Sequence, residues 1–243
     1  MFATSVLITG ANRGVGFELL CKLVGKTNIM FATCRSPQEA TELQNMAKQH
    51  ANITVLELDV TREDTISAAV NVIAETVGEK GLNCLINNAG QITRGSLAES
   101  TADDLRRLYE VNVIGPAMVA KECLPLLRKA ACSGEDMCVS RAAVLNISSI
   151  MGSIASTSSS GHLPYRMSKA ALNMFTKSLS IELKSDGILV ASIHPGWVQT
   201  DMGGPRAAVT VDESASSIID LVSTFTEKHN GGLYGWNGEN IPW

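Results

Sequence analysis

The stretch TSVLITGANRGVGFELL, Thr4 to Leu20, joins a short run of β-branched and apolar residues to a segment with helical apolar spacing. Glycines at positions 10, 14 and 16 lie in the turn between them. Glycine permits a tight turn, and the first turn of a helix offers free N–H groups and a positive dipole end to a pyrophosphate. The spacing GxxxGxG differs from the commoner GxGxxG fingerprint, and a purely structural turn is the alternative. Its place directly after a first strand favours a nucleotide-binding turn.

The rest of the chain repeats this order of strand and helix. Short apolar runs, each followed by a longer amphipathic segment, predict strands at residues 4–9, 28–34, 53–58, 83–87, 142–148, 188–194 and 232–236. Their nearly continuous apolar character indicates strands that are covered on both faces. Capping patterns at 36–39, 61–64 and 101–104 begin intervening helices. The prediction is an α/β fold: one doubly wound domain over residues 1–243, with a seven-stranded, mainly parallel sheet and helices on both faces.

The composition is that of an ordinary globular protein. Hydrophobic residues make up 45% of the 243 residues and charged residues 18%, with a net charge of −4. Lysine and arginine are scattered, so nucleic acid is not an expected partner. No apolar run is long enough to span a membrane, and the first residues lack the features of a signal peptide. The six cysteines show neither a CxxC pair nor metal-ligand spacing. We therefore expect reduced, mostly buried thiols, no metal and a cytoplasmic protein. Cys132 and Cys138 flank a turn and could form a disulfide, which is the alternative.

Residues that follow the predicted strands point to a dinucleotide, because ligands of parallel sheets bind at the carboxyl ends of the strands. NAD-selective folds typically place an acidic residue after the second strand, but Arg35 stands there, and Arg13 lies in the glycine turn. Two guanidiniums near the adenosine ribose would attract a 2′-phosphate, so NADP(H) is the expected cofactor; an exposed arginine without a partner is the alternative. Asp59 could accept a hydrogen bond from adenine or cap a helix. The small residues of NNAG, 87–90, could admit a flat ligand or form a turn.

The stretch LPYRMSKAALNMF, Leu163 to Phe175, places Tyr165 and Lys169 four residues apart at the start of a predicted helix. That spacing puts both side chains on one helix face. An amphipathic surface helix explains the pair without any chemistry. The functional interpretation is a proton donor, since an ammonium and an oxidised nicotinamide beside the phenol would lower its pKa from about 10.

Six motifs occur in a recognisable order along the chain. They are TGxxxGxG at 9–16, NNAG at 87–90, Asn112 in VNVIG, the serine pair of NISS at 146–149, YxxxK at 165–169 and PGWVQT at 195–200. In these motifs and their order the sequence resembles the short-chain dehydrogenase/reductase family over nearly its whole length. NISSIMGSI, HPGWVQTDMGG and the closing IPW are most similar to a carbonyl reductase subfamily. The resemblance implies a Rossmann fold that binds NADP(H).

The resemblance also implies catalytic roles. Tyr165 would protonate the alkoxide as hydride leaves the nicotinamide, Lys169 would hold the ribose hydroxyls, and Ser149 would orient the substrate carbonyl. Ser148 is the alternative to Ser149. Ser153 is a second, less favoured alternative. We consider it because more residues separate the serine pair from the tyrosine than is usual in the family.

Further residues are carried over from the same resemblance. Asn112 would bind a water molecule that passes protons to the lysine; a buried asparagine at a helix kink is the alternative. The expected cofactor-binding residues are Gly10, Asn12, Arg13, Gly14, Val15, Gly16, Arg35, Asp59, Val60, Asn88, Ala89, Gly90, Tyr165, Lys169, Pro195, Val198 and Thr200.

The function we expect is NADPH-dependent carbonyl reduction, with hydride transfer to an aldehyde, ketone or quinone. An NAD(P)-linked alcohol or hydroxysteroid dehydrogenase and a non-catalytic nucleotide-binding signalling protein are the alternatives. The short segment DMGGPRAAVTVDES, 201–214, suggests an open cleft for small apolar carbonyls. Family members often associate through long helices, here around 101–130 and 163–185, so a dimer or tetramer is one expectation and a monomer the other.

Overall fold

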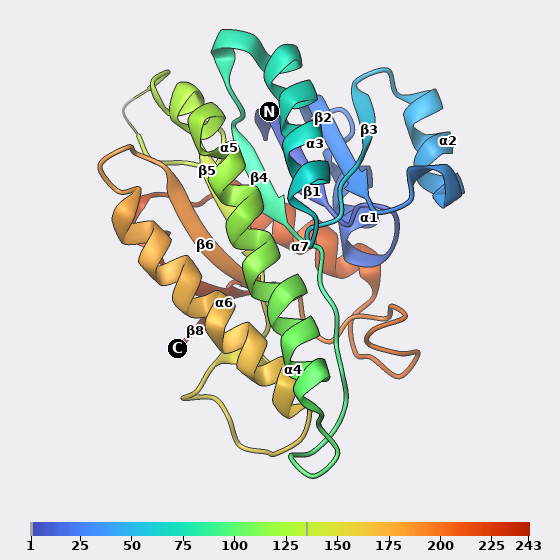
Figure 1. The fold of residues 1–243 in the computed structure, drawn as a ribbon. Coiled ribbons are helices and arrows are strands. Elements are labelled where there is room, and N and C mark those ends of the chain that lie inside the picture. The colour runs from blue at the N-terminus through green and yellow to red at the C-terminus, as the bar shows by residue number, and fades with distance from the viewer. Residues whose placement is uncertain (1, 135) are drawn as a thin grey trace.

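One twisted sheet forms the centre of the molecule (Figure 1). The computed structural model describes residues 2–134 and 136–243, and in that part of the chain eight strands form a sheet in the order β3-β2-β1-β4-β5-β6-β7-β8. Neighbouring strands from β3 to β7 are parallel, and β8 is antiparallel to β7. The strands are β1 (Ala3–Thr9), β2 (Thr27–Cys34), β3 (Ile53–Glu57), β4 (Cys84–Asn87), β5 (Ala143–Ile147), β6 (Leu189–His194), β7 (Leu233–Gly235) and β8 (Asn240–Ile241).

Helices cover both faces of this sheet, which confirms the predicted doubly wound α/β architecture (Figure 1). α1 and α7 pack together on one face, and α3, α5 and α6 lie on the other. The helices are α1 (Gly14–Leu23), α2 (Thr41–Gln49), α3 (Glu63–Val77), α4 (Ala102–Tyr109), α5 (Gly115–Ala131), α6 (Leu163–Glu182) and α7 (Val211–Ser223). Shorter turns are η1 (Pro37–Glu39), η2 (Gly78–Lys80), η3 (Glu110–Ile114), η4 (Ile150–Gly152) and η5 (Glu227–His229). Of the helices described, none combines the length and the apolarity needed to cross a membrane.

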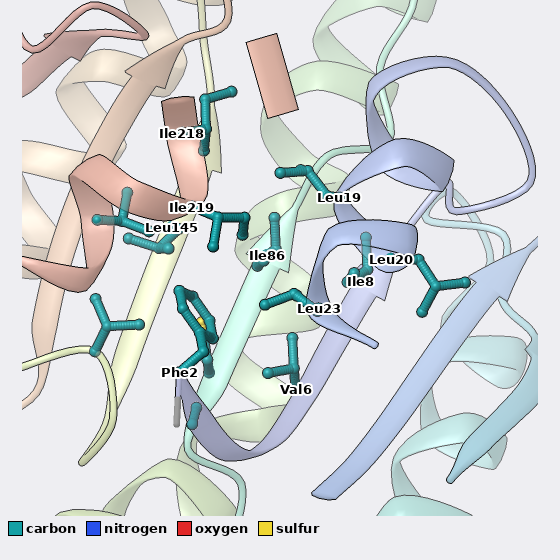
Figure 2. Packing of buried hydrophobic residues seen from close by; sticks show 14 of the residues in the cluster. Phe2, Val6, Ile8, Leu19, Leu20, Leu23, Ile86, Leu145, Ile218 and Ile219 are labelled. Atoms are coloured by element: carbon teal, nitrogen blue, oxygen red, sulfur yellow. The ribbon is translucent and has the colours of Figure 1, made fainter. Parts of the chain in front are cut away.

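Two apolar cores lie on opposite faces of the sheet, because successive side chains along a strand point to opposite faces. Val6 and Ile8 of β1 belong to the core under α1 and α7, whereas Leu7 between them belongs to the core under α3 and α5. Figure 2 shows the first core, with Phe2, Val6, Ile8, Leu19, Leu20, Leu23, Ile86, Leu145, Ile218 and Ile219 labelled. The apolar runs seen in the sequence therefore reflect burial on both faces.

The order of the strands creates a crevice at the carboxyl edge of the sheet. From β1 the chain continues to β2 and β3 on one side, and it then crosses to β4 and β5 on the other. The connections that leave β1 and β4 therefore diverge, and ligands of doubly wound sheets bind at such a switch point.

A row of buried polar side chains fixes the strand ends next to this crevice. Asn87 of β4, Asn146 of β5 and Ser192 of β6 share one register row. Asn87 Nδ2 donates to Asn146 Oδ1 (2.9 Å), and Asn146 Nδ2 donates to Thr176 Oγ1 of α6 (2.8 Å). Thr176 Oγ1 and Ser192 Oγ are 2.8 Å apart. These bonds attach α6 to the sheet directly beneath the residues that follow β4 and β5.

The predicted seven strands are all present, but the sheet has an eighth, β8. Of the three predicted caps, one is confirmed: Thr101 Oγ1 accepts from the Asp104 N–H, and the Asp104 carboxylate accepts from the Thr101 N–H. The second is confirmed only in position: Ser36 is the N-cap of the short turn η1 and Pro37 follows it, but the Ser36 side chain makes no capping bond. The third is wrong: Thr61 Oγ1 donates to Asp59 Oδ1 (2.8 Å), and the N-cap of α3 is Arg62, one residue later.

Replacement of the confirmed cap should lower stability. We expect Thr101→Ala to reduce the free energy of unfolding by about 1 kcal/mol, because the first turn of α4 loses a hydrogen-bond acceptor. Urea titration followed by circular dichroism measures this change. Thr41→Ala is the control, since Thr41 is the first residue of α2, where the N-cap is Ala40 and no side-chain cap forms. Equal losses in the two variants would contradict a capping role.

All six cysteines are free thiols, and the pairing of Cys132 with Cys138 is not formed. Cys34, Cys84 and Cys123 are buried, Cys21 and Cys138 are half-buried and Cys132 is exposed, so only half of the thiols are buried as expected.

Candidate active site

A cleft of ≈ 670 Å³ opens at the carboxyl edge of the sheet and gathers most of the predicted cofactor-binding residues. It is lined by Gly10, Asn12, Arg13, Gly14, Val15, Gly16, Arg35, Asp59, Val60, Asn88, Ala89, Gly90, Tyr165, Lys169, Pro195 and Thr200. Of the predicted residues, Val198, Ser149 and Asn112 do not line it. The N-terminal turn and the residues from α6, which are more than 140 positions apart in the sequence, thus meet in one cavity.

The glycine turn has the shape that a pyrophosphate requires. Gly10 and Gly14 have φ angles of +66° and +56°, in the region that favours glycine. A Cβ atom on Gly16 would lie 2.3 Å from Asn88 Nδ2 and 2.4 Å from the Gly10 oxygen. The side chain of Arg13, the N-cap of α1, does not cap the helix. The first N–H groups of α1 therefore remain available to an anion.

The segment after β4 braces the glycine turn. Thr9 Oγ1 accepts hydrogen bonds from the N–H groups of Asn88 and Ala89, both at 3.0 Å. Asn88 Nδ2 donates to the carbonyl oxygens of Thr9 (2.9 Å) and Gly10 (3.0 Å). The NNAG motif thus holds the turn in shape from the neighbouring strand.

The two arginines expected near a 2′-phosphate differ in their surroundings. Arg35 is exposed directly after β2, and among residues 2–134 and 136–243 it has no ion-pair partner. Arg13 forms an ion pair with Asp201, Nη1 to Oδ2, at 3.1 Å. Asp59 Oδ1 accepts from Thr61 N–H (2.9 Å) and Oγ1, so one of its oxygens stabilises the turn after β3.

Tyr165 and Lys169 lie on the buried side of α6, at 7% and 5% exposure. Lys169 Nζ is 5.7 Å from the centre of the Tyr165 ring and donates to the Ile147 carbonyl oxygen (2.8 Å). Burial lowers the pKa of Lys169 to about 8. It raises the pKa of Tyr165 to about 12, and a hydrogen bond with Ser149 lowers that pKa in part. Without a cofactor the pKa of Tyr165 is raised because burial removes the phenolate from water, and the lowering expected beside an oxidised nicotinamide stays a prediction.

The two serines after β5 have different partners. Ser148 lines the cleft, but its Oγ donates to Asn173 Oδ1 of α6 at 2.6 Å, so this hydroxyl proton is already engaged. Ser149 shares a hydrogen bond with Tyr165, and its Oγ accepts from the Met151 N–H (3.1 Å). Ser153 is fully buried, and its Oγ donates to the Pro242 carbonyl oxygen. These partners favour Ser149 over both alternatives as the hydroxyl beside the phenol.

Asn112 is buried in the π-helical turn η3, between α4 and α5. Its Oδ1 accepts from the Gln91 N–H (2.9 Å), and its Nδ2 donates to the Gln91 carbonyl oxygen and to Ser168 Oγ, both at 2.9 Å. Ser168 Oγ donates in turn to the Tyr165 carbonyl oxygen (2.8 Å). The Asn112 side chain therefore connects the segment after β4 to the first turn of α6, and the proton-relay role assigned to it stays a prediction.

The segment after β6 covers the glycine turn. Pro195 and Thr200 line the cleft, and Thr200 Cγ2 would lie 3.3 Å from a Cβ on Gly14. Val198 is buried, and its backbone pairs with that of Val209 in an isolated parallel bridge.

Several cleft residues were not predicted. They are Cys34, Leu58, Thr61, Gln91, Arg107, Val111, Ile147, Gln199, Asp201, Met202 and Val211. Thr61 and Gln91 directly follow predicted residues, so an extension by one position would have included them. Arg107 comes from α4 and Val111 from η3, and neither belongs to a motif that the sequence shows.

Comparison with protein families assigns this fold and site to a class. A family model described as short chain dehydrogenase matches residues 4–209. The chain therefore belongs to the short-chain dehydrogenase family and is an oxidoreductase.

Relatives within the family include carbonyl reductases. The structure of the carbonyl reductase Sniffer of D. melanogaster superimposes with a TM-score of 0.97 at 41% identity, and covers 99% of this chain and 100% of that one. An NADPH-bound carbonyl reductase from chicken fatty liver has a TM-score of 0.95 at 40% identity, with 99% of each chain covered. The C-signal protein of Myxococcus xanthus is 36% identical over 163 residues, which is 67% of this chain and 93% of that protein.

Proposed function

We propose that this protein is a carbonyl reductase that uses NADPH to reduce small aldehydes, ketones or quinones, with Tyr165 as the proton donor. The observation that carries this proposal is the meeting of Tyr165, Lys169 and the glycine turn in one cleft. The likeness to carbonyl reductases over the full length of the chain supports it.

Each part of the cleft has a task in this reaction. The N-terminus of α1 and the glycine turn would hold the pyrophosphate, and Arg35 would attract a 2′-phosphate. The bound dinucleotide would supply a hydride to the carbonyl carbon. Ser149 would orient the carbonyl oxygen and stabilise the charge that develops on it. Tyr165 would donate its proton to that oxygen, and Lys169 would keep the phenol in place through its charge.

The protonation state of Tyr165 is compatible with the reductive direction. Reduction needs a phenol that still carries its proton, whereas alcohol oxidation needs a phenolate. Because burial raises the pKa to about 12, Tyr165 is protonated at neutral pH. Tyr165 therefore carries the proton that reduction requires.

Substrate size is tested with a panel of carbonyl compounds. The segment 201–214 is short and adds no long lid, so we expect small, apolar aldehydes, diketones and quinones to be preferred. The rate of NADPH oxidation, followed by absorbance, gives kcat/KM for each compound. A preference for bulky steroids would contradict an open cleft for small substrates.

Cofactor choice is tested at Arg35. We expect Arg35→Asp to reduce kcat/KM for NADPH by about 10-fold or more, because a charge-assisted hydrogen bond is replaced by a like-charge contact. The same variant should use NADH at least as well as the wild type. Arg106→Asp is the control, since this exposed arginine of α4 lies outside the cleft. An unchanged ratio of NADPH to NADH efficiency in Arg35→Asp would contradict the role of Arg35.

A further inference from the structure

An ion pair joins the two sides of the cleft mouth. Arg13 belongs to the glycine turn and Asp201 to the segment after β6, 188 positions later. Arg13 Nη1 lies 3.1 Å from Asp201 Oδ2, and the two side chains are 70% and 80% exposed. Both residues line the cleft. The pair forms where Thr200 already contacts the glycine turn, so it connects two segments that both border the dinucleotide site.

This ion pair makes the two cleft arginines unequal. Arg35 is exposed at the end of β2 and has no ion-pair partner in the described part of the chain, whereas Arg13 is held by a carboxylate. A ligand that carries a phosphate near Arg13 would have to compete with Asp201 for the guanidinium.

We propose that Asp201 is a specificity-determining residue that competes with the cofactor's 2′-phosphate for Arg13; this inference rests on the proposed use of NADPH. A phosphate monoester carries about −1.5 to −2 charges at neutral pH and a carboxylate only one, so the phosphate can displace Asp201. An exposed arginine–carboxylate pair is weak, and its loss costs little. Asp201 thereby weakens binding of a 2′-phosphorylated ligand and leaves an unphosphorylated one almost unaffected.

Binding of two small probes separates these effects from catalysis. Isothermal titration calorimetry with adenosine 2′,5′-bisphosphate and with adenosine 5′-monophosphate uses the whole protein and needs no carbonyl substrate. We expect Asp201→Asn to bind the bisphosphate about two- to five-fold more tightly, which is the range that an exposed ion pair permits. Affinity for the monophosphate should stay the same. The gain in affinity for the bisphosphate should shrink as salt is raised, because exposed charges are screened.

A second substitution shows whether the effect acts through Arg13. In an Arg13→Ala background, Asp201→Asn should no longer improve binding of the bisphosphate, because the competitor has lost the group for which it competes. Asp212→Asn is the matched control: it removes the same charge from a neighbouring exposed position that pairs with Lys22 on α1 instead. An equal gain in Asp212→Asn would point to general charge repulsion and overturn the inference.

The remaining outcomes are also decisive. If Asp201→Asn improves binding equally with and without Arg13, or leaves it unchanged, the competition is refuted while the preference of the wild type for the bisphosphate still supports NADPH. If the wild type does not prefer the bisphosphate over the monophosphate, the proposed use of NADPH fails, and the inference fails with it. Comparison of unfolding midpoints confirms that each variant is folded before its affinity is compared.

Discussion

Tyr165→Phe is expected to abolish carbonyl reduction while NADPH binding is retained. The substitution removes only the phenolic oxygen from a side chain that is 7% exposed, so the packing of the ring on α6 is kept. A positioned proton donor contributes about 10²–10⁴-fold to a rate, and we expect kcat to fall by about 10³-fold. NADPH oxidation with the preferred carbonyl measures kcat, and calorimetry measures the affinity for NADPH.

Tyr234→Phe is the matched control for that experiment. Tyr234 of β7 is also 7% exposed, but it packs against Phe225, at 4.9 Å between ring centres, and does not line the cleft. Its loss should leave kcat near the wild-type value. A Tyr165→Phe variant that keeps more than about a tenth of the wild-type kcat contradicts its role as proton donor. A wild-type protein that binds NADPH but reduces no carbonyl would instead support the non-catalytic signalling alternative.

The parallel sheet could be predicted because burial on both faces leaves continuous apolar runs in its central strands, such as β1, β4, β5 and β6. The edge strand β8 leaves no such trace, since it has two residues and Asn240 is exposed. Helix starts were harder to locate. The Thr101 pattern forms its cap on a free surface, whereas the Thr61 hydroxyl donates to Asp59, two residues earlier. This local bond competes with the cap, and the capping pattern alone does not show which of the two forms.

The site could be predicted where its functional residues lie close together in the sequence. The glycine turn and the Tyr165–Lys169 spacing each lie within a few residues, and both are found in the cleft. The choice between Ser148 and Ser149 depends on Asn173 of α6, which is distant in the sequence. The pKa of Tyr165 depends on how deeply the ring is buried, and spacing along a helix carries no information about depth. Asp201 was missed for a related reason, since its partner lies at the other end of the chain.

Lys169 connects the site to the pH dependence of stability. Its pKa falls from 10.5 in an exposed lysine to about 8 in the folded protein, because burial disfavours the ammonium. The unfolded chain therefore binds more protons than the folded protein between these two values. Stability contributed by this group is present above the higher value and is lost as the pH falls through the lower one. The free energy of unfolding should accordingly rise with pH from about 8 upward.

Lys169→Met should remove both this pH dependence and the activity. Methionine fills similar space without a charge. We expect kcat to fall by about 100-fold or more, since in the proposed reaction this charge would hold the phenol and the ribose hydroxyls. The unfolding free energy of the wild type, relative to the variant, should increase by about 2–3 kcal/mol between pH 8 and pH 10. Urea titrations of the cofactor-free proteins measure this difference, and the comparison cancels groups common to both. The range ends at pH 10 because Tyr165, whose pKa is raised, lowers stability above it.

Lys177→Met, which removes a charge from an exposed position of α6, is the control. A wild-type difference that stays flat across this range would mean that Lys169 is hydrated in solution, and the dry, charge-assisted phenol on which the proposed reduction depends would then be excluded.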